Sequence, residues 1–136
     1  MLNTTAMFEL TQFQVTKRRR TFDMPANHVQ YFRANGNYVD LFAQGEKFLH
    51  RITMSVLEQG LPSTFLRIHR SWIVNVKFIK QVQYLCNNEY RFTFMDGTEV
   101  VSGRSFKPQI ASFLNDSDDR ERTLRVWAFA RQATAA

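Results

Sequence analysis

The stretch that does most to decide the fold spans residues 65–76 and reads Phe-Leu-Arg-Ile-His-Arg-Ser-Trp-Ile-Val-Asn-Val. Both of its ends are rich in β-branched and aromatic residues, which favour strands. Three polar residues, His69, Arg70 and Ser71, interrupt it in the middle. The pattern therefore predicts a strand, a polar turn whose side chains can reach outward, and a second strand.

On both sides of this stretch, further apolar runs alternate with turn dipeptides. Towards the N-terminus, a short turn of helix is expected over 26–29. Two half-apolar runs then flank Asn35-Gly36-Asn37, and Gln44-Gly45 leads into a third run through Phe48. Towards the C-terminus, residues 79–85 and 90–94 flank Asn87-Asn88, and Asp96-Gly97 precedes a return strand over 98–102. Such dipeptides mark tight hairpins, and we expect both central residues of the Asp96-Gly97 turn to have positive φ. Tight turns between successive strands predict antiparallel sheets and a mostly β fold.

Two short helices are expected among these strands. The first contains Met54, Leu57 and Leu61 on one face, and either Thr53 or Ser55 can cap it; Ser55 and Glu58 have capping-box spacing. Ser105 is expected to cap the second helix. Its apolar face comprises Phe106, Ile110, Phe113 and Leu114.

Composition limits the class of protein. A chain of 136 residues suits one domain, and its single cysteine, Cys86, excludes an intrachain disulfide and a cysteine-based zinc site and suits a reducing cytoplasm. We expect no signal peptide and no membrane span, because no apolar run approaches the roughly 20 residues that a span needs. The net charge is +6, and residues 115–136 are neutral, with four arginines and four acidic residues. A basic body favours a polyanionic partner, either nucleic acid or an anionic membrane surface.

The pattern of reactive residues argues against an enzyme. His28, His50 and His69 have no metal-ligand spacing, and the sequence contains neither a glycine-rich phosphate loop nor a Gly-x-Ser-x-Gly motif. We therefore expect no catalytic residue, no metal and no cofactor. Arg70 and Arg104 fall at junctions between elements, where a guanidinium could bond guanine or a phosphate, although both could equally be ordinary solvated arginines.

Other features each leave two interpretations open. Asn35 and Asn37 could contact DNA or merely serve a turn, and spacing favours the turn. The basic run Lys17–Arg20 is interpreted as a solvated turn in preference to a phosphate-contacting arm. Tyr90, Phe92 and Phe94 could stack single-stranded bases or form core, and their alternation with polar residues favours core. A single-stranded nucleic-acid binder and a protein-interaction module are accordingly the alternatives to a duplex binder.

Several motifs, in order, carry a resemblance to a known family. Residues 29–39, Val-Gln-Tyr-Phe-Arg-Ala-Asn-Gly-Asn-Tyr-Val, resemble the opening pattern I-x-Y-I-x-A-x-G-N-Y. Arg51-Ile-Thr53, with Leu57, Leu61 and Phe65, resembles the strand-to-helix segment, and residues 65–75 are nearly F-x-R-x-H-R-S-x-I-V-N. Asp96-Gly97 and residues 102–106 resemble the closing motif, with Gly103 as a departure. Residues 22–114 thus resemble the LytTR domain, the DNA-binding output module of many bacterial response regulators.

The resemblance implies an elongated stack of antiparallel sheets that inserts loops into successive major grooves of double-stranded DNA at promoter or operator repeats. It implies a cytoplasmic transcriptional regulator that binds no membrane, and it leaves self-association on DNA open. The implied DNA-binding residues are Asn37, Tyr38, His69, Arg70, Lys77, Lys80, Arg104, Ser105 and Lys107. Among them, Arg70 and Arg104 match base-reading positions, the lysines are candidate phosphate contacts, and His69 is expected to shape its loop through the backbone. Asn75 and its apolar neighbours Ile68, Ile73 and Val74 are expected to be structural.

The ends of the chain fall outside this match. Residues 1–21 are expected to be a lead-in segment, with an extended strand near 7–15, and are too short for the receiver domain that precedes most such output modules. The chain is therefore either a cut-out output domain or a free-standing regulator. Residues 115–136 are expected to form a tail with a short helix, in which Trp127 and Phe129 pack on the domain or on a second chain.

Overall fold

A computed structural model describes residues 9–115, so the expected tail helix with Trp127 and Phe129 lies outside the described residues. The chain divides into two compact units, Met1–Val76 and Lys77–Ala136. The first unit holds β1 (Gln12–Lys17), β2 (Arg20–Pro25), η2 (Ala26–His28), β3 (Val29–Asn35), β4 (Tyr38–Ala43), β5 (Glu46–His50), α1 (Met54–Gly60), β6 (Phe65–His69) and β7 (Trp72–Asn75). Beyond η3 (Val76–Phe78), the second holds β8 (Ile79–Tyr84), β9 (Tyr90–Phe94), β10 (Glu99–Val101), η4 (Arg104–Phe106) and α2 (Lys107–Leu114).

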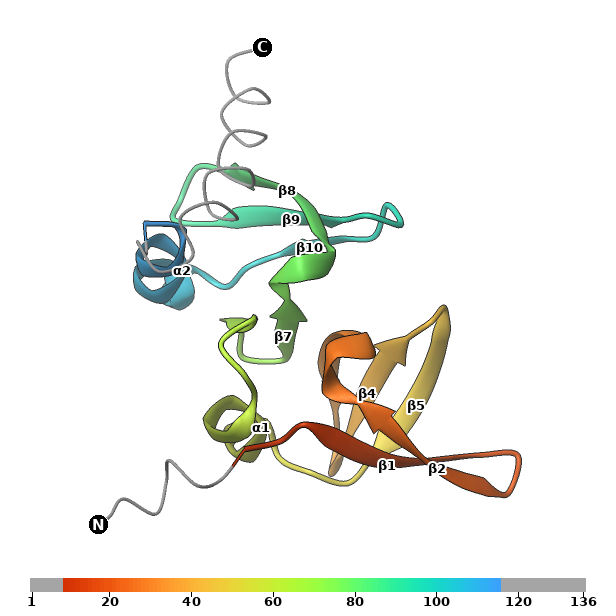
Figure 1. Cartoon of the computed structure of the whole chain (residues 1–136). Coiled ribbons are helices and arrows are strands. Elements are labelled where there is room, and N and C mark those ends of the chain that lie inside the picture. The colour runs from red at the N-terminus through yellow and green to blue at the C-terminus, as the bar shows by residue number, and fades with distance from the viewer. Residues whose placement is uncertain (1–8, 116–136) are drawn as a thin grey trace. The chain divides into compact units, whose positions relative to one another are not determined.

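Antiparallel pairing organises the first unit, as the turn dipeptides predicted. Its larger sheet has the strand order β5-β4-β3-β7-β6, and β1 and β2 form a separate hairpin (Figure 1). The two-residue turn Gln44-Gly45 joins β4 to β5, with φ of 54° and 77°. Because both turn residues have positive φ, their backbone twist matches the twist of the strands that they join.

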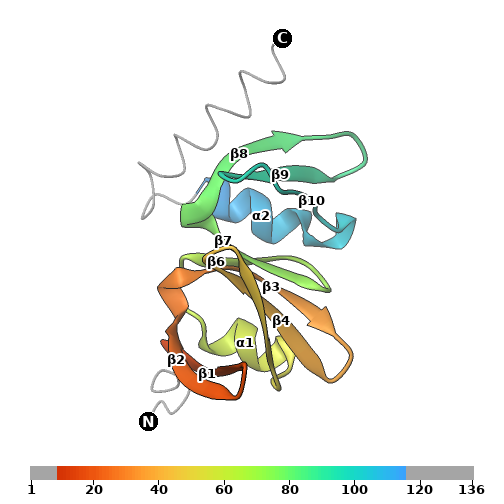
Figure 2. The same ribbon diagram turned by 90° about the vertical axis from the view of Figure 1, so that its right-hand side faces the viewer.

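One core holds this unit together. The fully buried residues Phe32, Leu41 and Leu57 come from two strands of the sheet and from α1, and Figure 2 shows α1 beside these strands. The strand expected near 7–15 coincides with β1 only over 12–15, because β1 begins at Gln12 and continues to Lys17; Phe13 and Val15 of β1 join the same core. The segment before residue 22 therefore contributes core side chains to the first unit.

The cap of α1 settles a choice that the sequence left open. The Thr53 hydroxyl accepts a hydrogen bond from the Val56 amide at 3.1 Å, so Thr53 is the N-cap. Ser55 lies inside the helix, and the expected capping box between Ser55 and Glu58 does not form. Glu58 instead forms an ion pair with Arg67 of β6.

The second unit contains a three-stranded antiparallel sheet with the order β10-β9-β8. Asn87 and Asn88 turn the chain between β8 and β9 with φ of 62° and 66°. The expectation of two positive φ values at Asp96-Gly97 is wrong, because only Gly97 has one, at 94°. The Asp96 carboxylate accepts a hydrogen bond from the Thr98 amide at 2.9 Å, so a side chain closes this turn.

The aromatic residues of β9 are core residues. Tyr90, Phe92 and Phe94 are all buried, which excludes the base-stacking platform considered from the sequence. Burial, together with the neighbouring Tyr84, raises the pKa of Tyr90 above its ordinary value. The face of this strand that could have stacked bases is therefore closed to a ligand.

The start of α2 differs from the expectation. Ser105 lies within η4 and does not cap the helix; Phe106 occupies the N-cap position without a side-chain cap hydrogen bond. Pro108 lies in the first turn, where the missing amide costs little. Ile110 and Leu114 of the expected apolar face are buried. The mostly β, antiparallel fold class is confirmed, and no helix within 9–115 is long and apolar enough to cross a membrane.

Candidate nucleic-acid interface

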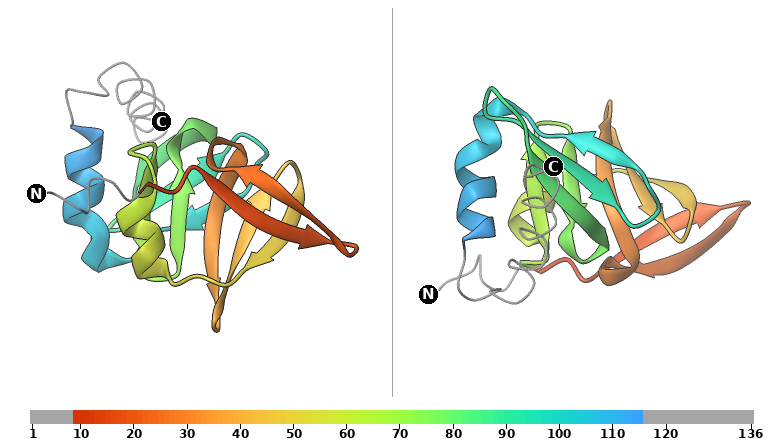
Figure 3. Two further views of the ribbon diagram at one scale, coloured as in Figure 1. Left: turned by 60° about the horizontal axis from the view of Figure 1, so that its bottom comes forward. Right: turned by 90° about the horizontal axis from the view of Figure 1, so that it is seen from above.

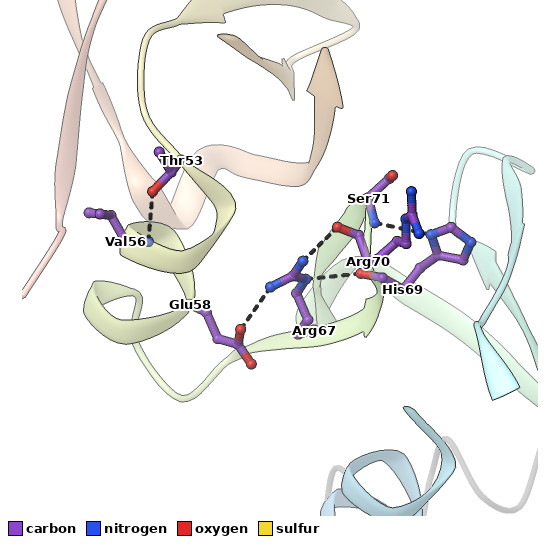
Figure 4. A network of polar contacts seen from close by, with 7 residues as sticks. All are labelled: Thr53, Val56, Glu58, Arg67, His69, Arg70 and Ser71. Atoms are coloured by element: carbon purple, nitrogen blue, oxygen red, sulfur yellow. Dashed lines mark hydrogen bonds and ion pairs between the residues drawn. The ribbon is translucent and has the colours of Figure 1, made fainter. Parts of the chain in front are cut away.

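The β6–β7 turn carries Arg70, and the side chain of Arg67 fixes the backbone of this turn (Figure 4). Arg67 donates from Nε to the carbonyl oxygen of His69 at 2.9 Å and from Nη2 to that of Arg70 at 2.5 Å. Its Nη1 donates to Oε1 of Glu58, on α1, at 2.8 Å. One guanidinium thus joins α1 to two consecutive carbonyls of the turn, and its side chain is only 15% exposed.

His69 fixes the same turn from its other side. Its Nδ1 accepts a hydrogen bond from the Ser71 amide at 3.0 Å, so the expectation that His69 shapes the loop through the backbone is confirmed. In neutral imidazole an accepting Nδ1 places the proton on Nε2, which remains a donor. The strand pairing is irregular between Arg67 and His69, as is common where a strand redirects a side chain.

Arg70 itself is exposed at the tip of this turn. Within the described part of the chain its guanidinium makes no ion pair, whereas Arg67 is fully engaged. Asn75 at the end of β7 is buried and donates from Nδ2 to the Val29 carbonyl at 2.9 Å, which ties β7 to β3. Asn75, Ile68, Ile73 and Val74 are all buried, in agreement with the structural role expected for them.

The β3–β4 turn carries Asn37 and Tyr38. Below it, the buried Asp40 carboxylate accepts hydrogen bonds from Arg33 at 2.9 Å and from Asn35 at 3.1 Å. Asn35 therefore serves the turn, as its spacing suggested. Tyr38 is 44% exposed and Asn37 is exposed beside it. Both line a surface concavity of about 520 Å³ that also includes Arg51 and the start of α1.

Arg104 and Ser105 lie in η4 of the second unit, and both are exposed. The segment leading to them is fixed by Ser102, whose side chain is buried. The Ser102 amide donates to the Tyr90 carbonyl at 2.8 Å, and the Ser102 hydroxyl accepts from the Tyr90 amide at 2.9 Å. These two bonds attach the start of η4 to β9 of the same unit.

The three candidate lysines have different surroundings. Lys80 is exposed on β8. Lys77 Nζ lies 5.6 Å from the centre of the Phe78 ring. Lys107 Nζ donates to Asn88 Oδ1 at 3.3 Å and lies 5.5 Å from the centre of the Tyr84 ring. Lys107 therefore already links α2 to the β8–β9 turn.

The predicted residues fall into one group in each unit. Asn37, Tyr38, His69 and Arg70 belong to the first unit, and Lys77, Lys80, Arg104, Ser105 and Lys107 belong to the second. The residues that hold the turns, Arg67, Asp40 and Ser102, were not singled out from the sequence. A charged residue inside an apolar run was the available signal for Arg67 and Asp40. Within 9–115, no group of three or more His, Cys, Asp or Glu residues could hold a metal ion.

Two curated proteins share sequence similarity with part of this chain. Over 64 residues the chain is 34% identical to the sensory transduction protein LytT of Bacillus subtilis, which covers 46% of the chain and 27% of that protein. Over 45 residues it is 47% identical to the transcriptional regulatory protein LytR of Staphylococcus aureus, which covers 33% of the chain and 18% of that protein. The chain thus spans about a quarter or less of the length of these relatives.

A solved structure gives the same fold. The LytTr DNA-binding domain of a Bacillus cereus protein superposes with a TM-score of 0.72 and 22% identity, covering 78% of this chain and 98% of that one. The family model of the LytTr DNA-binding domain matches residues 19–115, which include parts of both units and the turns that carry the predicted site residues. The chain belongs to the LytTr DNA-binding domain family.

Proposed function

We propose that this chain is a transcriptional regulator that binds double-stranded DNA in a sequence-specific manner. The observation that carries the proposal is the β6–β7 turn, in which Arg67 and His69 fix the backbone while Arg70 is exposed and forms no ion pair with any residue of 9–115. A base-reading side chain gains from a rigid mount, because less conformational entropy is lost on binding. Membership of a DNA-binding family supports the same conclusion.

The proposed roles follow from the chemistry of each side chain. Arg70 and Arg104 contact base edges, since a guanidinium can bond O6 and N7 of guanine together. Asn37 and Tyr38 extend the contact from the β3–β4 turn. Lys77, Lys80, Lys107 and the hydroxyl of Ser105 contact phosphates, which set the position of the protein on the duplex. His69 acts mainly by shaping the turn that carries Arg70.

The setting of this activity is also part of the proposal. We place the regulator in the bacterial cytoplasm, acting at promoter or operator repeats, where copies of the chain can associate on DNA. The DNA-binding domain is proposed to span 22–114, with β1 completing the core of its first unit. The residues beyond 115 form an appendage with no proposed DNA contact, and no catalytic activity is proposed.

Selection of duplexes from a random pool, followed by fluorescence anisotropy, tests this function. The selected duplex should bind more tightly than a scrambled duplex, and a single strand of the same sequence should compete poorly. Binding should weaken steeply with salt, because each phosphate contact contributes about −0.9 to the slope of log K against log salt. Equal affinity for all three ligands, or no duplex binding at low salt, would contradict the proposal.

A further inference from the structure

The tip of the β1–β2 hairpin gathers three arginines outside the turns described above. Lys17 and Arg20 form the last residue pair of the hairpin, and Arg18 and Arg19 are its two turn residues. Figure 3 shows this hairpin extending from the first unit, with the turn at its far end. Arg18, Arg19 and Arg20 are all exposed.

The backbone of this turn is an unfavourable place for arginine. Arg18 and Arg19 have φ of 53° and 65°, a left-handed conformation that suits glycine and asparagine. Most other positions with positive φ in residues 9–115 obey that preference: Gly36, Gly45, Gly97, Asn87 and Asn88. Two consecutive arginines at such positions contradict the local rule, and this kind of conflict concentrates at functional sites.

Among residues 9–115, no acidic side chain pairs with the three arginines of the tip. Lys17 forms an ion pair with Glu46 and lies 5.4 Å from the centre of the Phe48 ring, so it anchors the hairpin to β5. In the described part of the chain, neither Arg18, Arg19 nor Arg20 forms an ion pair. Asp23, the acidic residue of β2, pairs with Gln14, three residue pairs away from Lys17 and Arg20.

From these observations we infer that the β1–β2 tip binds the sugar-phosphate backbone of the duplex, at a site separate from the base-reading turns. A guanidinium can bond two phosphate oxygens at once, and such contacts carry no sequence information. The tip therefore raises the affinity for every duplex and leaves discrimination between sequences to Arg70 and Arg104. This inference rests on the duplex binding proposed above.

The double variant Arg18→Asn/Arg19→Gly separates binding from folding. Asn-Gly is the preferred pair for a two-residue hairpin turn, so the variant should unfold at a higher temperature than the wild type. It should also bind the selected and scrambled duplexes more weakly by a similar factor, with the salt slope less steep by about two units. If the two proteins bind equally at 1 M salt, where the electrostatic contribution vanishes, loss of two phosphate contacts makes the variant bind roughly 60-fold more weakly than the wild type at 0.1 M salt.

Two control variants of the full chain isolate the cause. Gln44→Asn creates the same favourable Asn-Gly pair at the β4–β5 turn, where φ is 54°, without changing the charge, and should leave duplex binding unaltered. Lys47→Gln removes one exposed positive charge from β5, as Arg19→Gly does from the tip. Arg19→Gly should lower the salt slope by about one unit and Lys47→Gln by clearly less.

The outcomes are distinct. If the wild type binds duplexes but Arg18→Asn/Arg19→Gly retains its affinity and salt slope, the inferred site is wrong and the proposed function stands. If the double variant loses only the distinction between selected and scrambled duplexes, the tip reads sequence and the inference is also wrong. Unchanged duplex binding with lost binding to vesicles of anionic lipid would assign the tip to a membrane surface instead. Absence of duplex binding by the wild type would overturn both proposals.

Discussion

The turn that carries Arg70 and the segment that carries Arg104 are fixed by different kinds of bond. Arg67 holds the first with a guanidinium that reaches two carbonyls and one carboxylate, near the surface of its unit. Ser102 holds the second with one hydroxyl and one amide, both buried against Tyr90. Arg67 fixes the backbone path of the β6–β7 turn, whereas the buried Ser102 hydroxyl mainly attaches the segment before η4 to β9. Loss of Arg67 and loss of Ser102 should therefore have different consequences.

The largest effect is expected from Arg67→Ala. The variant loses three hydrogen bonds at once. A hydrogen bond to a charged group contributes about 1.5–3 kcal/mol net of competition with water, but the contributions of bonds made by one side chain do not add, and water reaches the carbonyls of an exposed turn. We expect about 2–3 kcal/mol of lost unfolding free energy in urea titration, together with loss of discrimination between selected and scrambled duplexes. Arg67→Lys should recover part of the stability through Glu58 but little of the discrimination, because an ammonium lacks the planar fork.

Glu58→Gln is the matched control for Arg67→Ala. It removes the carboxylate from an ion pair whose glutamate side chain is 46% exposed, so its effect on stability should be below about 1 kcal/mol. The two bonds from Arg67 to the turn carbonyls remain possible in this variant. Discrimination as poor as that of Arg67→Ala would show that α1, rather than the carbonyl contacts, sets the turn.

The next largest effects are expected from substitution of the two exposed arginines, Arg70 and Arg104. Arg70→Ala and Arg104→Ala should each cost about 1–3 kcal/mol of binding free energy on the selected duplex and relax the preference at one or two base pairs. Unfolding free energies should stay near wild type, because both side chains are exposed. Arg70→Lys keeps the charge without the fork. Full discrimination by Arg70→Lys would make Arg70 a phosphate contact and shift specificity to Arg104, the Asn37 turn or DNA shape.

Ser102→Ala probes the buried anchor. The Tyr90 amide loses its acceptor in a site that excludes water, so the second unit should be destabilised by about 1–2 kcal/mol in urea unfolding. The backbone bond from Ser102 to Tyr90 remains, and Arg104 should keep its orientation at low urea. Discrimination should therefore survive in Ser102→Ala at a temperature where the protein is folded, in contrast to Arg67→Ala. Equal loss of discrimination in both variants would remove the distinction between the anchors.

A smaller effect separates two of the lysines of the second unit. Lys80→Gln should weaken binding to all duplexes alike and lower the salt slope by about one unit. Lys107→Gln should change the slope less, because Lys107 already donates to Asn88 and lies beside the Tyr84 ring. A full unit of slope lost in Lys107→Gln would mean that DNA displaces Asn88 as the partner of Lys107.

The smallest effect concerns alkaline pH. The pKa of Tyr90 is raised in the folded protein by burial and by Tyr84, so the unfolded chain releases this proton first as pH rises. The unfolded state then binds fewer protons, and stability falls with pH from about 10, the ordinary tyrosine value, upwards. Thermal melts of the wild type between pH 9 and 11 should show this loss, and Tyr90→Phe should reduce it. An identical decline in Tyr90→Phe would assign the loss to other groups.

How far the sequence could predict this molecule is clearest from its turns. Turns at Gln44-Gly45 and Asn87-Asn88 were expected from residue type alone, and Gly45, Asn87 and Asn88 adopt the positive φ that glycine and asparagine tolerate, whereas Gln44 adopts a φ of 54° against its preference. The Arg18-Arg19 turn adopts the same conformation although arginine disfavours it. From the sequence, these two residues could be recognised only as part of a basic run. At Asp96-Gly97, the Asp96 carboxylate accepts a hydrogen bond from the Thr98 amide, and only Gly97 has a positive φ. Residue type alone does not show which of the two turn conformations the chain adopts.

The candidate site shows a similar division. His69 was correctly expected to bond the backbone, and the location of Arg70 between two strands follows from the polar interruption in an apolar run. The anchoring roles of Arg67 and Ser102 depend on partners that the fold brings close, Glu58 for one and Tyr90 for the other. Ser105 was expected to be a cap because of its residue type, but η4 begins one residue earlier and places Ser105 inside a helical turn.

The single cysteine also has a practical consequence. Cys86 is exposed in the second unit, while Trp72 opens β7 in the first and packs beside Tyr31, with 4.8 Å between ring centres. A maleimide fluorophore on Cys86 and the native indole therefore label the two units separately, without an added cysteine. In a chain carrying Trp127→Phe, resonance energy transfer between these labels would report any change in their separation as DNA is added.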